Sequence, residues 1–226
     1  MPLTSPQSFF AIEEFEHSSL FQQIEHVWEV LPNISIYLSQ YSLGEIESPL
    51  PDGLHLENPH SIRIGKNCLI EPGCFIKGPC IIGDHSEVRQ GAYIRGNVIT
   101  GKKCIIGHAT EIKNSILLDG AKAPHFNYVG DSILGKDTNL GAGVICSNLR
   151  LDNQNINFLI KGRIFSSKSN KIGLILGDRS QIGCNTVSNP GTLIGKDVLC
   201  FPSLNIGGWI PEKSMIKGQK FSVEVR

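Results

Sequence analysis

A six-residue period runs through much of the chain, and it limits the possible folds more than any other feature. Every sixth position from residue 64 is aliphatic with one exception, and these positions are Ile64, Ile70, Ile76, Ile82, Val88, Ile94, Thr100, Ile106, Ile112 and Leu118. Four places later in each repeat the residue is mostly small, as in Cys68, Cys74 and Ala92. An α-helix has a period of about 3.6 and an isolated strand a period of two, so neither explains this pattern.

A period of six is typical of short flat strands joined by tight turns, with the aliphatic residue pointing inward. Each coil then buries its apolar side chains only against the coils above and below it. The pattern returns later in the chain, at Leu134, Leu140, Leu176, Ile182, Ile194 and Ile206, with polar or small exceptions at Ser188 and Cys200. The sequence therefore predicts an all-β protein, a parallel β-helix over residues 51–226.

Residues 1–50 lack the repeat and are predicted to form an N-terminal helical cap. Phe15, Leu20, Ile24 and Val27 follow at roughly helical spacing, and Pro32 is expected to end the helix. The cap is expected to cover the open end or edge of the coil stack, where backbone groups would otherwise be unpaired. A helix that binds a partner is the alternative.

The second interruption is an excursion over residues 150–172. Ile156, Phe158 and Ile160 occupy every second position, as is typical of a β-strand, and the dipeptide Lys161-Gly162 that follows is typical of a turn. We therefore predict a protruding β-hairpin. The hairpin is either a structural excursion or a flap over a site or onto a neighbouring subunit.

Composition excludes several classes of protein. Lys and Arg total 21, as do Asp and Glu, so no basic excess favours nucleic acid or an anionic membrane. No signal peptide and no apolar run long enough to span a bilayer is present, so a soluble cytoplasmic protein is expected. The seven cysteines are odd in number and show no paired metal-ligand spacing such as C-x-x-C, which favours buried thiols over disulfides or a zinc site.

Three basic residues share one register position, since Lys77, Arg95 and Lys113 follow one another at intervals of three hexapeptides. If three hexapeptides make one turn, these side chains stack on one face. Like charges at the strand spacing of about 4.8 Å repel unless an anion or an acidic group answers them. The column is therefore either a phosphate-binding site or a solvated basic surface.

The register slips at AKAPHFNYVGD, residues 121–131, where His125, Asn127 and Tyr128 interrupt a uniform coil. A histidine with a pKa near its ordinary value of about 6.5 can serve as a base at neutral pH. A structural role for His125 is the alternative. A zinc site of His85, His108 and His125 ranks lower, because no two of these three histidines are spaced as H-x-x-x-x-H.

The block GHATEIKNSILLDGAKAPHFNYVGDSILGKDTNLGAGVICSNLR, residues 107–150, resembles the acetyltransferase half of the bacterial bifunctional glucosamine-1-phosphate acetyltransferase/N-acetylglucosamine-1-phosphate uridyltransferase. The later part, from NLRLDNQ on, looks more like archaeal relatives that act on amino-sugar-1-phosphates. This resemblance implies a left-handed parallel β-helix, a homotrimer, and acetyl-CoA as co-substrate. No metal is implied, and no uridyltransferase half is expected in this chain.

The resemblance also implies roles for individual residues. The family's A-G-H-x-x-Y-x-G-D motif places the catalytic base on His125 and a substrate contact on Tyr128. Its phosphate-binding residues fall on Arg95 and Lys113, and its sugar-contacting asparagines on Asn139 and Asn148. Its acetyl-binding turn is Gly141-Ala142-Gly143, so Ala142 and Gly143 are the expected coenzyme contacts, together with Cys184 at a serine position.

The chain departs from the family at Pro124, which replaces the motif's glycine. Leu149 stands where the bacterial enzymes have a sugar-contacting tyrosine, and Gln154 falls near a lysine that Lys161, Lys168 or Lys171 would have to replace. The predicted function is acetyl transfer from acetyl-CoA to the amine of an amino-sugar-1-phosphate, glucosamine-1-phosphate first, for UDP-N-acetylglucosamine synthesis. The alternatives are an acyltransferase with a nucleotide sugar or another acceptor, and a non-catalytic scaffold or sugar-phosphate sensor.

Overall fold

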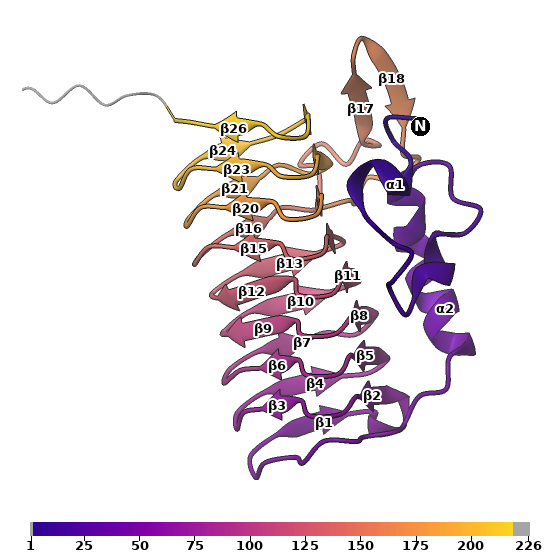
Figure 1. The fold of residues 1–226 in the computed structure, drawn as a ribbon, viewed down its shortest axis with the longest axis vertical. Coiled ribbons are helices and arrows are strands. Elements are labelled where there is room, and N and C mark those ends of the chain that lie inside the picture. The colour runs from indigo at the N-terminus through magenta and orange to yellow at the C-terminus, as the bar shows by residue number, and fades with distance from the viewer. Residues whose placement is uncertain (1, 219–226) are drawn as a thin grey trace, which may run out of the picture.

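The protein is a stack of coils in which every coil contributes one short strand to each of three parallel sheets (Figure 1). The structure, a computed structural model, describes residues 2–218. Sheet B consists of β1 (His55–Glu57), β4 (Phe75–Lys77), β7 (Tyr93–Ile94), β10 (Glu111–Lys113), β13 (Tyr128–Gly130), β16 (Ile145–Cys146), β21 (Val187–Ser188) and β24 (Asn205–Ile206).

The chain runs from sheet B to sheet A, then to sheet C, and back to B one coil higher. Sheet A consists of β2 (Ile62–Ile64), β5 (Cys80–Ile82), β8 (Val98–Thr100), β11 (Ser115–Leu117), β14 (Ile133–Leu134), β19 (Leu174–Leu176), β22 (Thr192–Ile194) and β25 (Trp209–Ile210). Sheet C consists of β3 (Leu69–Ile70), β6 (Glu87–Val88), β9 (Ile105–His108), β12 (Lys122–His125), β15 (Asn139–Leu140), β20 (Gln181–Ile182), β23 (Leu199–Cys200) and β26 (Met215–Ile216). The predicted fold class, a left-handed parallel β-helix, is confirmed.

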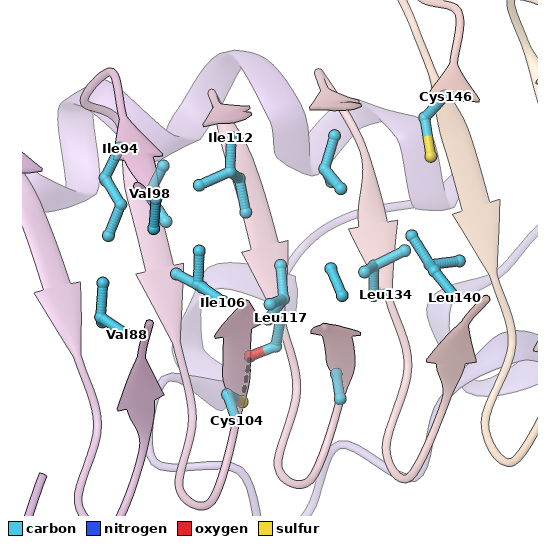
Figure 2. Packing of buried hydrophobic residues seen from close by; sticks show 14 of the residues in the cluster. Val88, Ile94, Val98, Cys104, Ile106, Ile112, Leu117, Leu134, Leu140 and Cys146 are labelled. Atoms are coloured by element: carbon cyan, nitrogen blue, oxygen red, sulfur yellow. Dashed lines mark hydrogen bonds between the residues drawn. The ribbon is translucent and has the colours of Figure 1, made fainter. Parts of the chain in front are cut away.

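The inward residues of successive coils form one continuous apolar core (Figure 2). Ile94, Ile106 and Ile112 are all at most 1% exposed, as the six-residue period predicts. The expected lap of three hexapeptides holds where Cys80 pairs with Val98. The next lap is shorter by a single position, since Val98 pairs with Ser115. Leu117 is therefore the inward residue of that coil, and the prediction for Leu118 is wrong.

All seven cysteines are free thiols, and six of them are buried. Burial raises the pKa of the Cys80 thiol to about 12, so this side chain acts as a small apolar group in the core. The predicted burial of the cysteines is confirmed for these six. Cys184 alone is exposed.

The N-terminal segment differs from the predicted continuous helix. It consists of α1 (Pro6–Phe9), the 3₁₀ turns η1 (Ser18–Phe21) and η2 (Val27–Asn33), and α2 (Ile34–Gln40), while a third 3₁₀ turn, η3 (Pro59–Ser61), follows β1. Pro32 lies inside η2, and α2 follows directly, so the expected helix end at this proline is wrong. Proline is compatible with a short 3₁₀ turn because few backbone N–H groups there need an intrahelical partner.

Most of this segment covers the outer face of sheet A, which was not predicted (Figure 1). Within its described part, only residues 44–48 cover the edge of the stack, where Ile46 bridges Ile64 of β2. The physical reason for the cover on sheet A is the composition of this sheet, whose strands are apolar on both faces. Ile81, Ile99 and Ile116 point outward at successive coils, yet each is at most 2% exposed because Phe15, Trp28 and other N-terminal residues pack over them. A parallel sheet with two apolar faces must be covered on both.

The predicted hairpin is confirmed as β17 (Asn157–Ile160) and β18 (Arg163–Ser166), which pair antiparallel around Lys161 and Gly162. One side of the hairpin packs on the N-terminal segment, where the rings of Phe158 and Trp28 stack with centroids 4.1 Å apart. The excursion leaves the coil where sheet B turns into sheet A. It lengthens that lap, so that Ile133 pairs with Ile175 on the next coil.

Candidate active site

The predicted basic column lies on the outer face of sheet B, at the edge where this sheet turns into sheet A. Ile94 pairs with Ile112, so Arg95 and Lys113 follow at equivalent places on neighbouring coils. Each cation has a carboxylate partner: Lys77 contacts Glu57 at 2.7 Å, Arg95 contacts Glu111 at 2.7 Å, and Lys113 contacts Asp131 at 2.6 Å. These acidic groups remove the repulsion that the sequence spacing implies.

The pairs differ in how firmly they are held. The side chains of Arg95 and Glu111 are 41% and 37% exposed, so water competes with their contact and either partner can turn toward a ligand. The side chains of Lys113 and Asp131 are only 18% and 7% exposed. Asp131 also accepts hydrogen bonds from the side-chain amides of Asn114, at 2.9 Å, and Asn148. Lys113 is therefore an ordered cation and Arg95 a more adaptable one.

Tyr128 brings a hydroxyl to the same place. Its register partner on the coil below is Glu111, and its hydroxyl lies over Gly130 beside the Asn148 amide. A Cβ at Gly130 would lie 2.7 Å from the Tyr128 hydroxyl, so a larger residue there would have to displace the Tyr128 or Asn148 side chain. Burial raises the pKa of Tyr128, and the nearby carboxylates of Glu111 and Asp131 act in the same direction. This hydroxyl is a neutral hydrogen-bonding group at physiological pH.

Four further predicted residues lie at the corner where sheet C turns into sheet B, which we call the C–B corner: His125, Ala142, Gly143 and Cys184. Backbone hydrogen bonds stack its coils: Gly143 N–H donates to the His125 carbonyl at 3.0 Å, and Asn185 N–H donates to the Ala142 carbonyl at 2.8 Å. His125, the turn of Ala142 and Gly143, and Cys184 therefore stand above one another on three successive coils. The proposed base and the proposed coenzyme contacts share one column.

The turn at residues 141–143 has one backbone N–H group that can bind a ligand. Gly143 is in the left-handed region, with φ of +74°, and its N–H already donates to the His125 carbonyl. Within residues 2–218, the Ala142 N–H has no hydrogen-bond acceptor, and the residue is partly exposed. His125 itself is exposed, and within the same described range its ring makes no hydrogen bond. Both groups can therefore meet a ligand.

The structure separates two predicted sets. Asn139 lies on the outer face of sheet C, where it pairs with Lys122 and Gln181, and not with the sheet B residues. In the hypothetical zinc set, His108 and His125 are register partners, but His85 belongs to the turn between sheets A and C. Among residues 2–218, no group of three or more His, Cys, Asp or Glu side chains is placed to hold a metal ion.

A cavity of about 550 Å³ adjoins the site beyond Lys113. It lies between the N-terminal segment, the roots of the hairpin and the corner from sheet B to sheet A, and Asn114, Asp131 and Lys171 are among its lining residues. Of the three lysines that were expected to compensate for Gln154, only Lys171 lines this cavity with Asp131. The Lys161 ammonium lies 5.8 Å from the centre of the Trp209 ring, away from this site.

Two carboxylates of the site were not assigned roles from the sequence. Asp131 is part of the motif around His125, and Glu111 precedes Lys113 by two residues, which places both on the same side of one strand. These spacings are the signals that would have identified them. The position of Asp131 relative to Lys113 was harder to predict. Lys113 pairs with Gly130, so the lap that joins these two residues is also one position shorter than three hexapeptides.

The fold and the site define a hexapeptide-repeat β-helix protein with a polar site on one face and along one corner. Residues 76–215 match the family model described as the GMPPB C-terminal domain. The chain belongs to this family. Over the described residues, no helix is both long and apolar enough to cross a membrane.

Individual proteins are similar to this chain as well. It is 33% identical over 151 residues to a bifunctional sugar-1-phosphate nucleotidylyltransferase/acetyltransferase of Sulfurisphaera tokodaii, covering 59% of this chain and 38% of that protein. It is also 33% identical over 207 residues to the bifunctional protein GlmU of Methanococcus maripaludis, covering 89% of this chain and 48% of that protein. The chain therefore spans less than half the length of these relatives, and the predicted resemblance is confirmed.

Solved structures show a more distant likeness. A UDP-N-acetylglucosamine acyltransferase from Campylobacter jejuni has a TM-score of 0.49 and 13% identity, covering 74% of this chain and 68% of that chain. The acetyltransferase domain of PglB from Neisseria gonorrhoeae has a TM-score of 0.30 and 13% identity, covering 83% of this chain and 60% of that chain.

Proposed function

We propose that the protein transfers the acetyl group of acetyl-CoA to the amine of an amino-sugar-1-phosphate, with glucosamine-1-phosphate as the first acceptor to test. The observation that carries this proposal is that two sets of groups flank the outer face of sheet B, one toward its edge with sheet A and the other at its edge with sheet C. Arg95, Lys113 and Tyr128 lie on the outer face of sheet B, and His125 lies below the Ala142 turn at the edge of that face. The relative from S. tokodaii is named as an acetyltransferase in part, which agrees with this reaction.

The acceptor phosphate is proposed to bind between Arg95 and Lys113. Arg95 exchanges its exposed contact with Glu111 for the phosphate, and the Lys113 ammonium keeps Asp131 on one N–H and offers its other two. Tyr128 and Asn148 supply neutral hydrogen bonds to the sugar. Binding in this way orients the amine toward the C–B corner.

At that corner His125 acts as the general base. It removes a proton from the amine as the nitrogen forms a bond to the thioester carbonyl carbon. The Ala142 N–H donates to the oxyanion of the tetrahedral intermediate, which collapses with cleavage of the C–S bond. The thiolate of coenzyme A leaves and takes up the proton. Cys184, one coil above, is proposed to contact the coenzyme.

The test is a thiol-release assay with acetyl-CoA and glucosamine-1-phosphate. His125→Ala is expected to lower kcat by about 10²–10⁴-fold. Lys113→Ala is expected to raise KM for the sugar phosphate while kcat changes less. His108→Ala is the matched control, because His108 is the register partner of His125 one coil below and has no proposed role. Wild-type turnover by His125→Ala would refute the assigned base.

A nucleotide-linked amino sugar is the second candidate acceptor. The cavity of about 550 Å³ beyond Asp131 is large enough for a group attached to the far side of the phosphate. Comparing kcat/KM for the sugar phosphate and the nucleotide sugar decides between the two acceptors. Binding of either acceptor without any thiol release would instead support a non-catalytic sensor.

A further inference from the structure

Asp131 is a buried carboxylate that takes no part in the chemistry described above, yet it contacts two residues with proposed substrate roles. The residue is 5% exposed. One carboxylate oxygen accepts from both the Lys113 ammonium, at 2.6 Å, and the Asn148 side-chain amide. The other accepts from the Asn114 amide at 2.9 Å. Three polar side chains from two other coils thus converge on one charge.

The backbone of Asp131 fixes this charge relative to the hairpin. Its N–H donates to the Lys113 carbonyl at 3.1 Å, and its carbonyl accepts from the Gly173 N–H at 2.8 Å, where the chain returns from the excursion. Asn148, on the outgoing side of the excursion, accepts at its own carbonyl from the Ile172 N–H at 2.9 Å. Asp131 is therefore held from both sides and cannot follow a ligand.

A lysine side chain has four rotatable bonds, so an unrestrained ammonium loses much conformational freedom when it binds an anion. The contact with Asp131 fixes Lys113 before a ligand arrives. The ammonium has three N–H donors and the Asn148 amide has two, so each group has donors beyond the one that Asp131 accepts, and the second N–H of Asn148 lies beside the Tyr128 hydroxyl. Groups ordered in advance bind more tightly because the ordering cost is already met in the free protein.

We propose that Asp131 is a positioning residue, which presents the Lys113 ammonium and the Asn148 amide as one preorganised pair of donors for the phosphorylated acceptor. This inference rests on the proposed function. Asp131 acts through these two partners and touches neither the reacting amine nor the thioester. Its loss is therefore expected to weaken acceptor binding and to leave the chemical step largely intact.

The test is Asp131→Asn, which keeps the shape of the side chain and removes its charge. KM for glucosamine-1-phosphate, and its Kd by calorimetry, are expected to rise about tenfold or more, because a charge-assisted hydrogen bond is lost. KM for acetyl-CoA and kcat are expected to stay within about threefold by the same reasoning. Equal KM values for the acceptor in variant and wild type would overturn the inference.

Asp178→Asn is the matched control. Asp178 is also fully buried, but it accepts the backbone amides of Ala11, at 2.7 Å, and Lys136, at 2.8 Å, at the corner between sheets A and C. This variant is expected to melt at a lower temperature with an unchanged KM for the acceptor. If it raises that KM as much as Asp131→Asn does, the effect is general loosening and the inference fails.

A double-mutant cycle separates positioning from a structural role. In the Lys113→Ala background, Asp131→Asn is expected to weaken acceptor binding far less than in the wild type, because its main partner is gone. An undiminished effect would show that Asp131 acts elsewhere. If Asp131→Asn does not fold, Lys113→Ala and Asn148→Ala replace it, and their combined loss is expected to be smaller than the product of the single losses. Fully multiplicative losses would refute coupling through Asp131.

The failures of the two proposals are distinguishable. If the wild type neither binds nor acetylates glucosamine-1-phosphate, the proposed function falls and the inference falls with it. If the wild type does both and Asp131→Asn does so equally well, only the role of Asp131 is refuted.

Discussion

His17 predicts that the N-terminal segment is destabilised by mild acid. The side chain is 1% exposed, its ring lies edge-on to Tyr41, and its Nδ1 is 2.9 Å from the Tyr37 hydroxyl. Burial lowers its pKa from 6.5 to about 4, and the charge of Arg63 acts in the same direction, whereas Glu16 opposes it. The imidazole is therefore neutral in the folded protein over most of the range in which an exposed histidine takes up a proton.

The sign follows from proton binding. Between pH 6.5 and about 4 the unfolded chain carries the proton on His17 and the folded chain does not, so the free energy of unfolding falls as pH falls through this window. Each pKa unit corresponds to about 1.4 kcal/mol. The lowered pKa of His17 therefore reduces the free energy of unfolding by about 2 kcal/mol between pH 7.5 and pH 5, and by about 3 kcal/mol once the pH is below 4.

The assay is urea unfolding at pH 7.5 and pH 5.0, followed by tryptophan fluorescence, because Trp28 belongs to the same segment. His17→Gln cannot take up a proton, so its loss of stability between the two pH values is expected to be about 2 kcal/mol smaller than that of the wild type. His60→Gln, at an exposed histidine, is the control for the other titrating groups. An identical pH dependence in His17→Gln and wild type would refute the reasoning.

Two further substitutions test the packing of the cover and the site. Trp28→Ala removes a side chain that is 2% exposed and stacked on Phe158, so it is expected to cost about 3–5 kcal/mol in urea unfolding and to expose the hairpin to proteolysis; unchanged stability and protection would contradict the packing. Gly130→Ala places a Cβ 2.7 Å from the Tyr128 hydroxyl and 2.8 Å from the Asn148 amide, so it is expected to raise KM for the acceptor several-fold, and an unchanged KM would show that these groups do not bind it.

Much of the fold could be predicted because the inward side chains repeat along the sequence itself. Ile76, Ile94 and Ile112 are all fully buried at the spacing of three hexapeptides that the period gives. Leu118 was wrongly predicted to face the core, because this lap is one position shorter than three hexapeptides and the inward residue is Leu117 instead. Leu117 and Leu118 are both apolar, so only the strand pairing shows which of them faces the core.

Parts of the candidate site could be predicted for the same reason. Arg95 and Lys113 are one lap apart, and the structure places them on neighbouring coils as expected. Their carboxylate partners, Glu111 and Asp131, could not be predicted from the six-residue period. Each cation contacts a carboxylate on the next coil, and a side-chain contact between coils leaves no repeat in the sequence. The order in Lys113 comes from the burial of Asp131, which depends on where the hairpin leaves and returns.

The sequence by itself determined the β-helix, since an inward residue at a regular interval requires a regular coil wherever that interval persists. The tertiary structure decided which face is covered and which charges meet. The N-terminal segment lies on sheet A because Phe15, Trp28 and their neighbours pack over the outward isoleucines of that sheet, and Trp28 also stacks on Phe158, far along the chain. Such contacts depend on complementary surfaces of segments without a common period, so no local pattern in the sequence carries them.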